Sequence, residues 1–104
     1  MPATSNPVQF EIASHDLKKA ALIFRAVNHP LRQRILQMIH RQERMTVTAI
    51  FTRLRMKQSI TSQHLAVLRK AGLVCTEKKG KNIYYDVSYE RLDQLHELAG
   101  KLIH

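Results

Sequence analysis

Gly72 divides the chain into a helical part and an extended part, and this division limits the folds open to it. Between residues 10 and 71 the apolar side chains recur every three or four positions, which is the spacing of one face of an α-helix. Residues 73–76 and 82–87 are instead rich in β-branched and aromatic side chains, which favour strands. Residues 77–81 between them contain a glycine, which indicates a turn. The sequence therefore predicts a mainly α protein with a small β-hairpin.

Two helices are expected in the first part of the chain. One helix, or two fused ones, covers residues 10–27, and the next covers residues 31–41. Pro30 separates them, because proline fits the first turn of a helix but disfavours helical geometry in the residue before it. Residues 1–7 hold two of the three prolines and are expected to form a disordered tail. The remaining residues, 8–104, are expected to form a single domain.

Two further helices are expected before the hairpin. Thr46 or Thr48 can cap the shorter one, which ends at residue 54. The longer one covers residues 58–71, and Gly72 can adopt the left-handed conformation of its C-terminal cap. Only residues 55–57 join these two helices, and so short a connection predicts a helix-turn-helix.

The positive charge of the chain is concentrated in its middle. The net charge is +9, yet residues 25–81 alone carry 13 Lys or Arg against two acids, while the preceding residues balance and residues 82–104 carry a net charge of −2. Such a distribution is typical of a face that binds a polyanion, because each neutralised phosphate releases condensed counterions. The alternative is a basic surface that only keeps the protein soluble.

The helix expected over residues 58–71 separates into two faces when its residues are placed at about 100° intervals. The inner face is mostly apolar and consists of Ile60, Thr61, His64, Leu65, Val67, Leu68 and Ala71. The outer face consists of Ser59, Ser62, Gln63, Ala66, Arg69 and Lys70. Short polar groups near the start of a helix suit the edges of DNA bases, and basic groups near its end suit phosphates. The alternative is an ordinary amphipathic helix with a solvated outer face.

The expected hairpin carries a basic tip. Lys78, Lys79 and Lys81 surround Gly80, where the chain can turn without a side-chain clash. We interpret the hairpin as a two-stranded wing that contacts the DNA backbone, which makes the predicted fold a winged helix-turn-helix with about five helices. The alternative is a solvated turn that is basic for solubility. The residues expected to contact DNA are Lys57, Gln58, Ser59, Ser62, Gln63, Arg69, Lys70, Lys78, Lys79 and Lys81.

Three strings of residues resemble the ArsR (arsenic-repressor) family of winged-helix regulators. They are HPLRQRIL at residues 29–36, SITSQHLAVLRKAGLV at residues 59–74 and KGKNIYY at residues 79–85. The resemblance covers about residues 17–103. It implies a homodimeric repressor of transcription that binds a palindromic operator in double-stranded DNA and is released by an effector.

The apolar stripes of the first and last helices agree with such a homodimer. Ser88 can cap the last helix, which has more apolar width than a monomer of 104 residues easily buries. The alternative is that both stripes cover the core of their own domain. The residues expected at the dimer interface are Phe10, Leu17, Ala21, Phe24, Leu92, Leu95, Ala99 and Leu102.

No metal site and no cofactor are expected, and the effector stays unidentified. Metal-sensing members of the family carry a Cys-x-Cys pair at the start of the third helix, or Asp, His and Glu ligands on the last helix. Residues 46–48 are here Thr-Val-Thr, and threonine hydroxyls do not replace thiolates for soft metals. The spacing of the potential ligands on the last helix departs from the family pattern; these are Asp93, His96, Glu97 and His104.

Two histidines and the single cysteine are expected to have structural roles. His29 precedes a helix-starting proline and is interpreted as a packing or capping residue, and His64 as a structural residue of the inner face. Cys75 is interpreted as a small buried apolar side chain, with a redox-sensing thiol as the alternative.

Other classes of protein fit the sequence less well. No run approaches the roughly 18 apolar residues that span a bilayer, and no secretory signal is recognised, so a cytoplasmic protein is expected. No nucleophile with a neighbouring base, paired carboxylates or phosphate-binding glycine loop indicates an enzyme. The alternative to a DNA-binding regulator is a winged-helix module that binds RNA or a protein partner.

Overall fold

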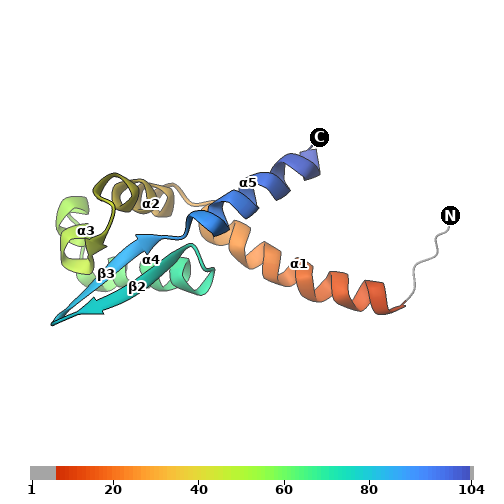
Figure 1. The fold of residues 1–104 in the computed structure, drawn as a ribbon, viewed down its shortest axis with the longest axis horizontal. Helices are drawn as coiled ribbons and strands as arrows, with labels where there is room; N and C mark the ends of the chain where they lie inside the picture. The colour runs from red at the N-terminus through yellow and green to blue at the C-terminus, as the bar shows by residue number, and fades with distance from the viewer. Residues whose placement is uncertain (1–6, 104) are drawn as a thin grey trace.

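A computed structural model describes residues 7–103 of the chain, with side chains from residue 14 onward. Figure 1 shows α2, α3, α4 and the hairpin packed together at one end, while α1 and α5 extend away from them on the same side. The predicted winged helix-turn-helix fold is confirmed. Its elements are α1 (Pro7–Val27), α2 (Pro30–Gln42), β1 (Met45–Thr46), α3 (Val47–Leu54), α4 (Gln58–Lys70), β2 (Val74–Lys79), β3 (Asn82–Val87) and α5 (Tyr89–Ile103).

The helix ends follow the local signals of the sequence. His29 caps α2, because its Nδ1 accepts a hydrogen bond of 3.4 Å from the backbone N–H of Arg32. Of the two threonines considered, Thr46 caps α3, since its Oγ1 accepts a bond of 3.2 Å from the N–H of Ala49. Gly72 follows the C-terminal cap of α4 with φ of +74°, the left-handed conformation expected there.

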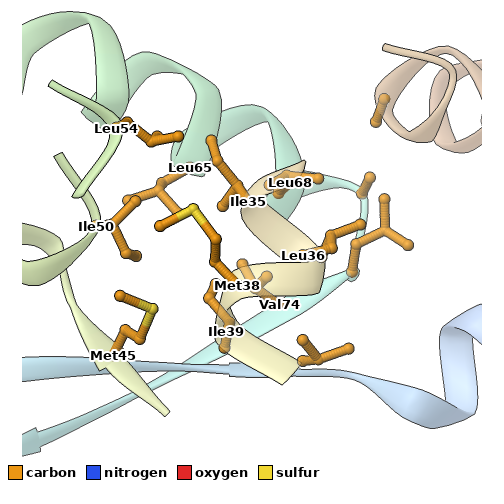
Figure 2. Packing of buried hydrophobic residues seen from close by; sticks show 14 of the residues in the cluster. Ile35, Leu36, Met38, Ile39, Met45, Ile50, Leu54, Leu65, Leu68 and Val74 are labelled. Carbon is orange, nitrogen blue, oxygen red and sulfur yellow. The ribbon is translucent and has the colours of Figure 1, made fainter. Parts of the chain in front are cut away.

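The core lies between α2, α3, α4 and one face of the sheet, as Figure 2 shows. Each of these elements contributes large apolar side chains that exclude water, which provides most of the stability of a domain without disulfides. The least exposed of these apolar side chains belong to Ile35, Ile39, Ile50, Leu65, Leu68 and Leu73.

The inner face of α4 is narrower than the sequence predicts. Thr61, Leu65, Leu68 and Ala71 are buried as expected, but Ile60 and Val67 are 41% and 37% exposed. In the helical projection these two residues lie together at one edge of the apolar arc. The neighbouring elements therefore cover only the rest of the arc, and the assignment of Ile60 and Val67 to the core is wrong.

The sheet contains a strand that the sequence analysis does not predict. The short strand β1 pairs antiparallel with β3, which gives the strand order β1-β3-β2. With only two residues, β1 is too short to show the alternation by which a strand is recognised.

The turn of the hairpin is tighter than predicted. The strand β2 runs on to Lys79, so that only Gly80 and Lys81 form the turn, and Gly80 has φ of +62°. A glycine with positive φ at the first of two turn residues is the requirement of a type II′ hairpin. Two of the three basic residues of the tip therefore lie in a strand.

Candidate nucleic-acid interface

The outer face of α4 is held outward by the burial of its inner face. Leu65 and Leu68 are 1% and 0% exposed, which fixes the rotation of the helix about its own axis. All the residues that the sequence assigns to the outer face are exposed, as are Lys57 and Gln58 at its start. This arrangement gives a rigid helix with short polar groups in its first turns and basic groups in its last turn.

The first turn of α4 is itself suited to an anion. Lys57 is the N-terminal cap, and its side chain makes no capping hydrogen bond. The first N–H groups of a helix have no partners within the helix and carry a partial positive charge, which favours a phosphate at this position. The first turn of α4 contains no acidic residue that would compete with such an anion.

The three wing lysines do not share one face. Lys78 pairs with Ile83 and Lys79 with Asn82 along the hairpin, so their side chains point to opposite sides of the ribbon. The ammonium of Lys79 lies 3.9 Å from a carboxylate oxygen of Glu77. The wing therefore offers Lys78, Lys79 and Lys81 as separate exposed charges rather than as a single cluster.

Two histidines, His29 and His64, contact each other on the inner side of α4. The rings of His29 and His64 lie 5.1 Å apart between their centroids and are tilted by 56°. Burial lowers the pKa of His64, and the nearby charges of His29 and Arg32 lower it further. His29 caps a helix as expected, and His64 stays half-buried on the inner side, away from the outer face of α4.

Sequence reasoning missed Arg44, which contacts both strands of the wing. Its guanidinium donates hydrogen bonds to Glu77 on β2 and to Asp86 on β3, and these bonds raise its pKa. No local signal could have found this cluster, because its members lie 33 and 42 positions apart in the chain.

Cys75 is exposed rather than buried. The residue pairs with Asp86 on β3, and its thiol donates a hydrogen bond of 3.8 Å to the carbonyl oxygen of Asp86. Side chains alternate between the two faces along β2, so Val74 faces the core and Cys75 faces the solvent. The interpretation of Cys75 as a buried apolar side chain is therefore wrong.

The helices α1 and α5 diverge from each other (Figure 1), and the pocket between them has apolar side chains of both helices in its lining. Further apolar side chains on the two helices are exposed. Leu17 and Leu102 are 67% and 71% exposed, and no residue of α5 within the described range is fully buried. Ala21 is also exposed. The other expected interface residues in the described range, Phe24, Leu92, Leu95 and Ala99, are half-buried. The side chain of Phe10 lies outside the part that the structure describes.

The potential metal ligands of α5 in the described range lie exposed along the helix. Asp93, His96 and Glu97 are exposed, and Glu97 forms an ion pair of 3.2 Å with Lys101. His104 lies outside the described residues. Among the side chains that the structure describes, those of residues 14–103, no group of three His, Cys, Asp or Glu is placed to hold a metal ion. No helix within residues 7–103 is long and apolar enough to span a membrane.

The comparison with known proteins places the chain in a family. Residues 29–76 match the model described as "Bacterial regulatory protein, arsR family". The transcriptional activator HlyU of Vibrio cholerae is 32% identical over 96 residues, which cover 92% of this chain and 88% of HlyU. The chain belongs to the ArsR family. The predicted resemblance is confirmed, and the protein is a transcriptional regulator.

Solved structures of similar proteins have the same fold. The crystal structure of NolR from Sinorhizobium fredii matches with a TM-score of 0.70 and 32% identity, covering 96% of this chain and 95% of NolR. The repressor PagR of Bacillus anthracis matches with a TM-score of 0.66 and 26% identity, covering 83% of this chain and 98% of PagR. HlyU is named an activator and PagR a repressor, so membership of the ArsR family leaves the direction of regulation open.

Proposed function

We propose that this ArsR-family regulator is a homodimeric repressor that binds a palindromic operator in double-stranded DNA. In this proposal the outer face of α4 reads the bases in the major groove, and the wing holds the sugar-phosphate backbone. The observation that carries it is the outer face of α4, where Ser62 and Gln63 stand exposed on a helix whose opposite side is locked into the core. Hydroxyl and amide groups can both donate and accept hydrogen bonds at base edges.

A second copy of the chain is the proposed occupant of the cleft between α1 and α5. Its lining includes Ile23, Phe24, Leu95 and Leu98, and the apolar exposure continues to the end of α5. A surface of this kind is costly to leave in water and is typical of a subunit interface. A two-fold axis through it would set two copies of α4 about 34 Å apart, one turn of B-DNA.

Release from DNA is proposed to depend on an effector other than a soft metal ion held at the start of α3. Thr46 stands there with its hydroxyl engaged by the N–H of Ala49, and Thr48 follows it. Neither residue offers the thiolate that a soft metal prefers. The DNA-binding part of the proposal does not depend on which effector acts.

Selection of bound fragments from genomic DNA tests the proposal. We expect a palindrome whose half-sites lie about 10 base pairs apart between their centres, because a two-fold dimer places its recognition helices one helical turn apart. The same protein is then titrated with the selected DNA, random DNA and structured RNA at two salt concentrations. Selection of sequences without two-fold symmetry, or tighter binding to the RNA than to the selected DNA, would contradict the proposal.

A further inference from the structure

Arg44 connects the base of the wing to both of its strands. It lies in the short link between α2 and β1, directly before Met45. Its Nη2 donates hydrogen bonds of 2.7 Å to Glu77 on β2 and 3.2 Å to Asp86 on β3, and its Nε donates one of 3.5 Å to Asp86. The guanidinium carbon also lies 5.3 Å from the centre of the Tyr84 ring. One side chain therefore reaches across the whole three-stranded sheet.

The register of the strands explains how this contact forms. Met45 pairs with Tyr85 and Thr46 with Tyr84, so the antiparallel ladder, continued by one residue, sets Arg44 opposite Asp86. Residues opposite each other point to the same face of a sheet, and Met45 takes the other face, where it is 6% exposed. Arg44 and Asp86 therefore lie on the outer face, away from the core.

Apart from the pairing of β3 with β1, few contacts fix the direction of the wing. Along β2 the side chains are buried or half-buried only at its first and third positions, and Ile83 near the tip is 46% exposed. Figure 1 shows the hairpin extending past the helices to a free tip. The contacts of Arg44 add a cross-strand tie between the hairpin and the chain segment that leaves α2.

Arg44 also changes the charges that the wing presents. Glu77 lies 2.7 Å from Arg44 but 3.9 Å from Lys79, so its carboxylate is satisfied chiefly by the arginine. Without Arg44, the carboxylate of Asp86 would lose its cationic partner, and Glu77 would bind Lys79 more closely. Both changes would weaken the attraction of the wing for phosphate.

From these contacts we infer that Arg44 is a positioning residue for DNA binding, which aligns the wing and neutralises its acids without touching DNA itself. The inference rests on the proposed function, because it assumes that the wing lysines contact phosphate. An exposed charge network of this kind adds little to the free energy of unfolding, so its effect is expected in DNA affinity rather than in stability.

A double-mutant cycle tests the inference. It compares the wild type, Arg44→Gln, a protein with Lys78, Lys79 and Lys81 replaced by alanine, and the combination of both changes. Arg44→Gln is expected to weaken operator binding about tenfold, within the range of coupling seen in charge networks. In the protein without the lysines the same change is expected to have a smaller effect, because no wing lysine is left to position and only the two exposed carboxylates still weaken binding.

The outcomes of the cycle separate the two proposals. If the lysine-free protein binds the operator as tightly as the wild type, the wing contact in the proposed function is wrong and Arg44 has nothing to position. If the lysine-free protein binds more weakly but Arg44→Gln has the same effect in both backgrounds, Arg44 contacts DNA or acts elsewhere, and only this inference is overturned. An unchanged affinity in Arg44→Gln alone overturns it as well.

Replacing Asp86 by alanine gives a test with opposite signs. Removing an acid near DNA strengthens binding if charge alone matters. The control Asp93→Ala removes an exposed acid on α5, away from the wing, and measures the effect of net charge without any contact to Arg44. The inference predicts weaker binding for Asp86→Ala, because Arg44 loses its partner on β3. Tighter binding by Asp86→Ala, with an unchanged melting temperature, would overturn the inference.

Discussion

Thr61→Val is expected to stabilise the protein, although it lies in the helix that we assign to DNA reading. Thr61 is 0% exposed, and its Oγ1 has no hydrogen-bond partner among the described residues. A buried hydroxyl without a partner costs roughly 1–3 kcal/mol relative to an apolar group of the same shape. Valine keeps the β-branched outline of threonine and replaces the hydroxyl by a methyl group. We expect a gain of about 1 kcal/mol in the free energy of unfolding, the lower end of this range.

Urea denaturation followed by circular dichroism at equal protein concentration measures this change. A gain of about 1 kcal/mol corresponds to a rise of roughly 4–8 °C in melting temperature for a domain of this size. Thr61→Ser is the matched control, because it keeps the hydroxyl and removes the methyl group, and it should destabilise the protein. A loss of stability in Thr61→Val as large as that in Thr61→Ser would refute the reasoning, since it would show that the hydroxyl has a partner.

Three further changes probe the wing, the half-buried His64 and the proposed dimer. Replacing Lys78 and Lys81 by alanine should each lower the slope of log affinity against log salt by about 0.9 per wing, with a smaller effect at Lys79, whose charge is partly offset by a neighbouring carboxylate; equal slopes before and after would place the wing away from phosphate. Because folding lowers the pKa of His64, the unfolded chain binds its proton more readily, so stability should be full above pH 6.5 and decrease as the pH falls below it. Urea midpoints at pH 7.5 and 5.5 should differ less in His64→Gln than in the wild type, and an equal difference would show that other groups cause the loss. Leu17→Glu, at a side chain that is 67% exposed, should convert the dimer to a folded monomer in analytical ultracentrifugation, whereas a dimer that persists would contradict the proposed interface.

The sequence was most informative where a local rule fixes the structure. The position of Gly72, the proline after His29 and the threonine before α3 each mark a helix end, and the structure has its helix ends there. The outer face of α4 was also predictable, because helical spacing decides which residues oppose the buried leucines.

The features that the sequence did not reveal depend on contacts between distant segments. The two-residue strand β1 exists because β3 lies beside it, and Arg44 finds its partners only through that pairing. The exposure of Ile60 depends on how far the neighbouring elements extend over the edge of α4. Spacing within one helix carries no information on such neighbours.

The base contacts assigned to α4 are the central claim, and the variant Ser62→Ala with Gln63→Ala tests them most directly. The affinities of this variant and of the wild type are measured for the selected operator and for random DNA, with Gln37→Ala on the exposed side of α2 as the control. We predict that the variant binds the operator about a thousandfold more weakly, because four base contacts are lost, two in each half-site, at roughly 1 kcal/mol or more each, and that it binds random DNA as before. An unchanged ratio of the two affinities would contradict the assignment of this face as the reader of DNA.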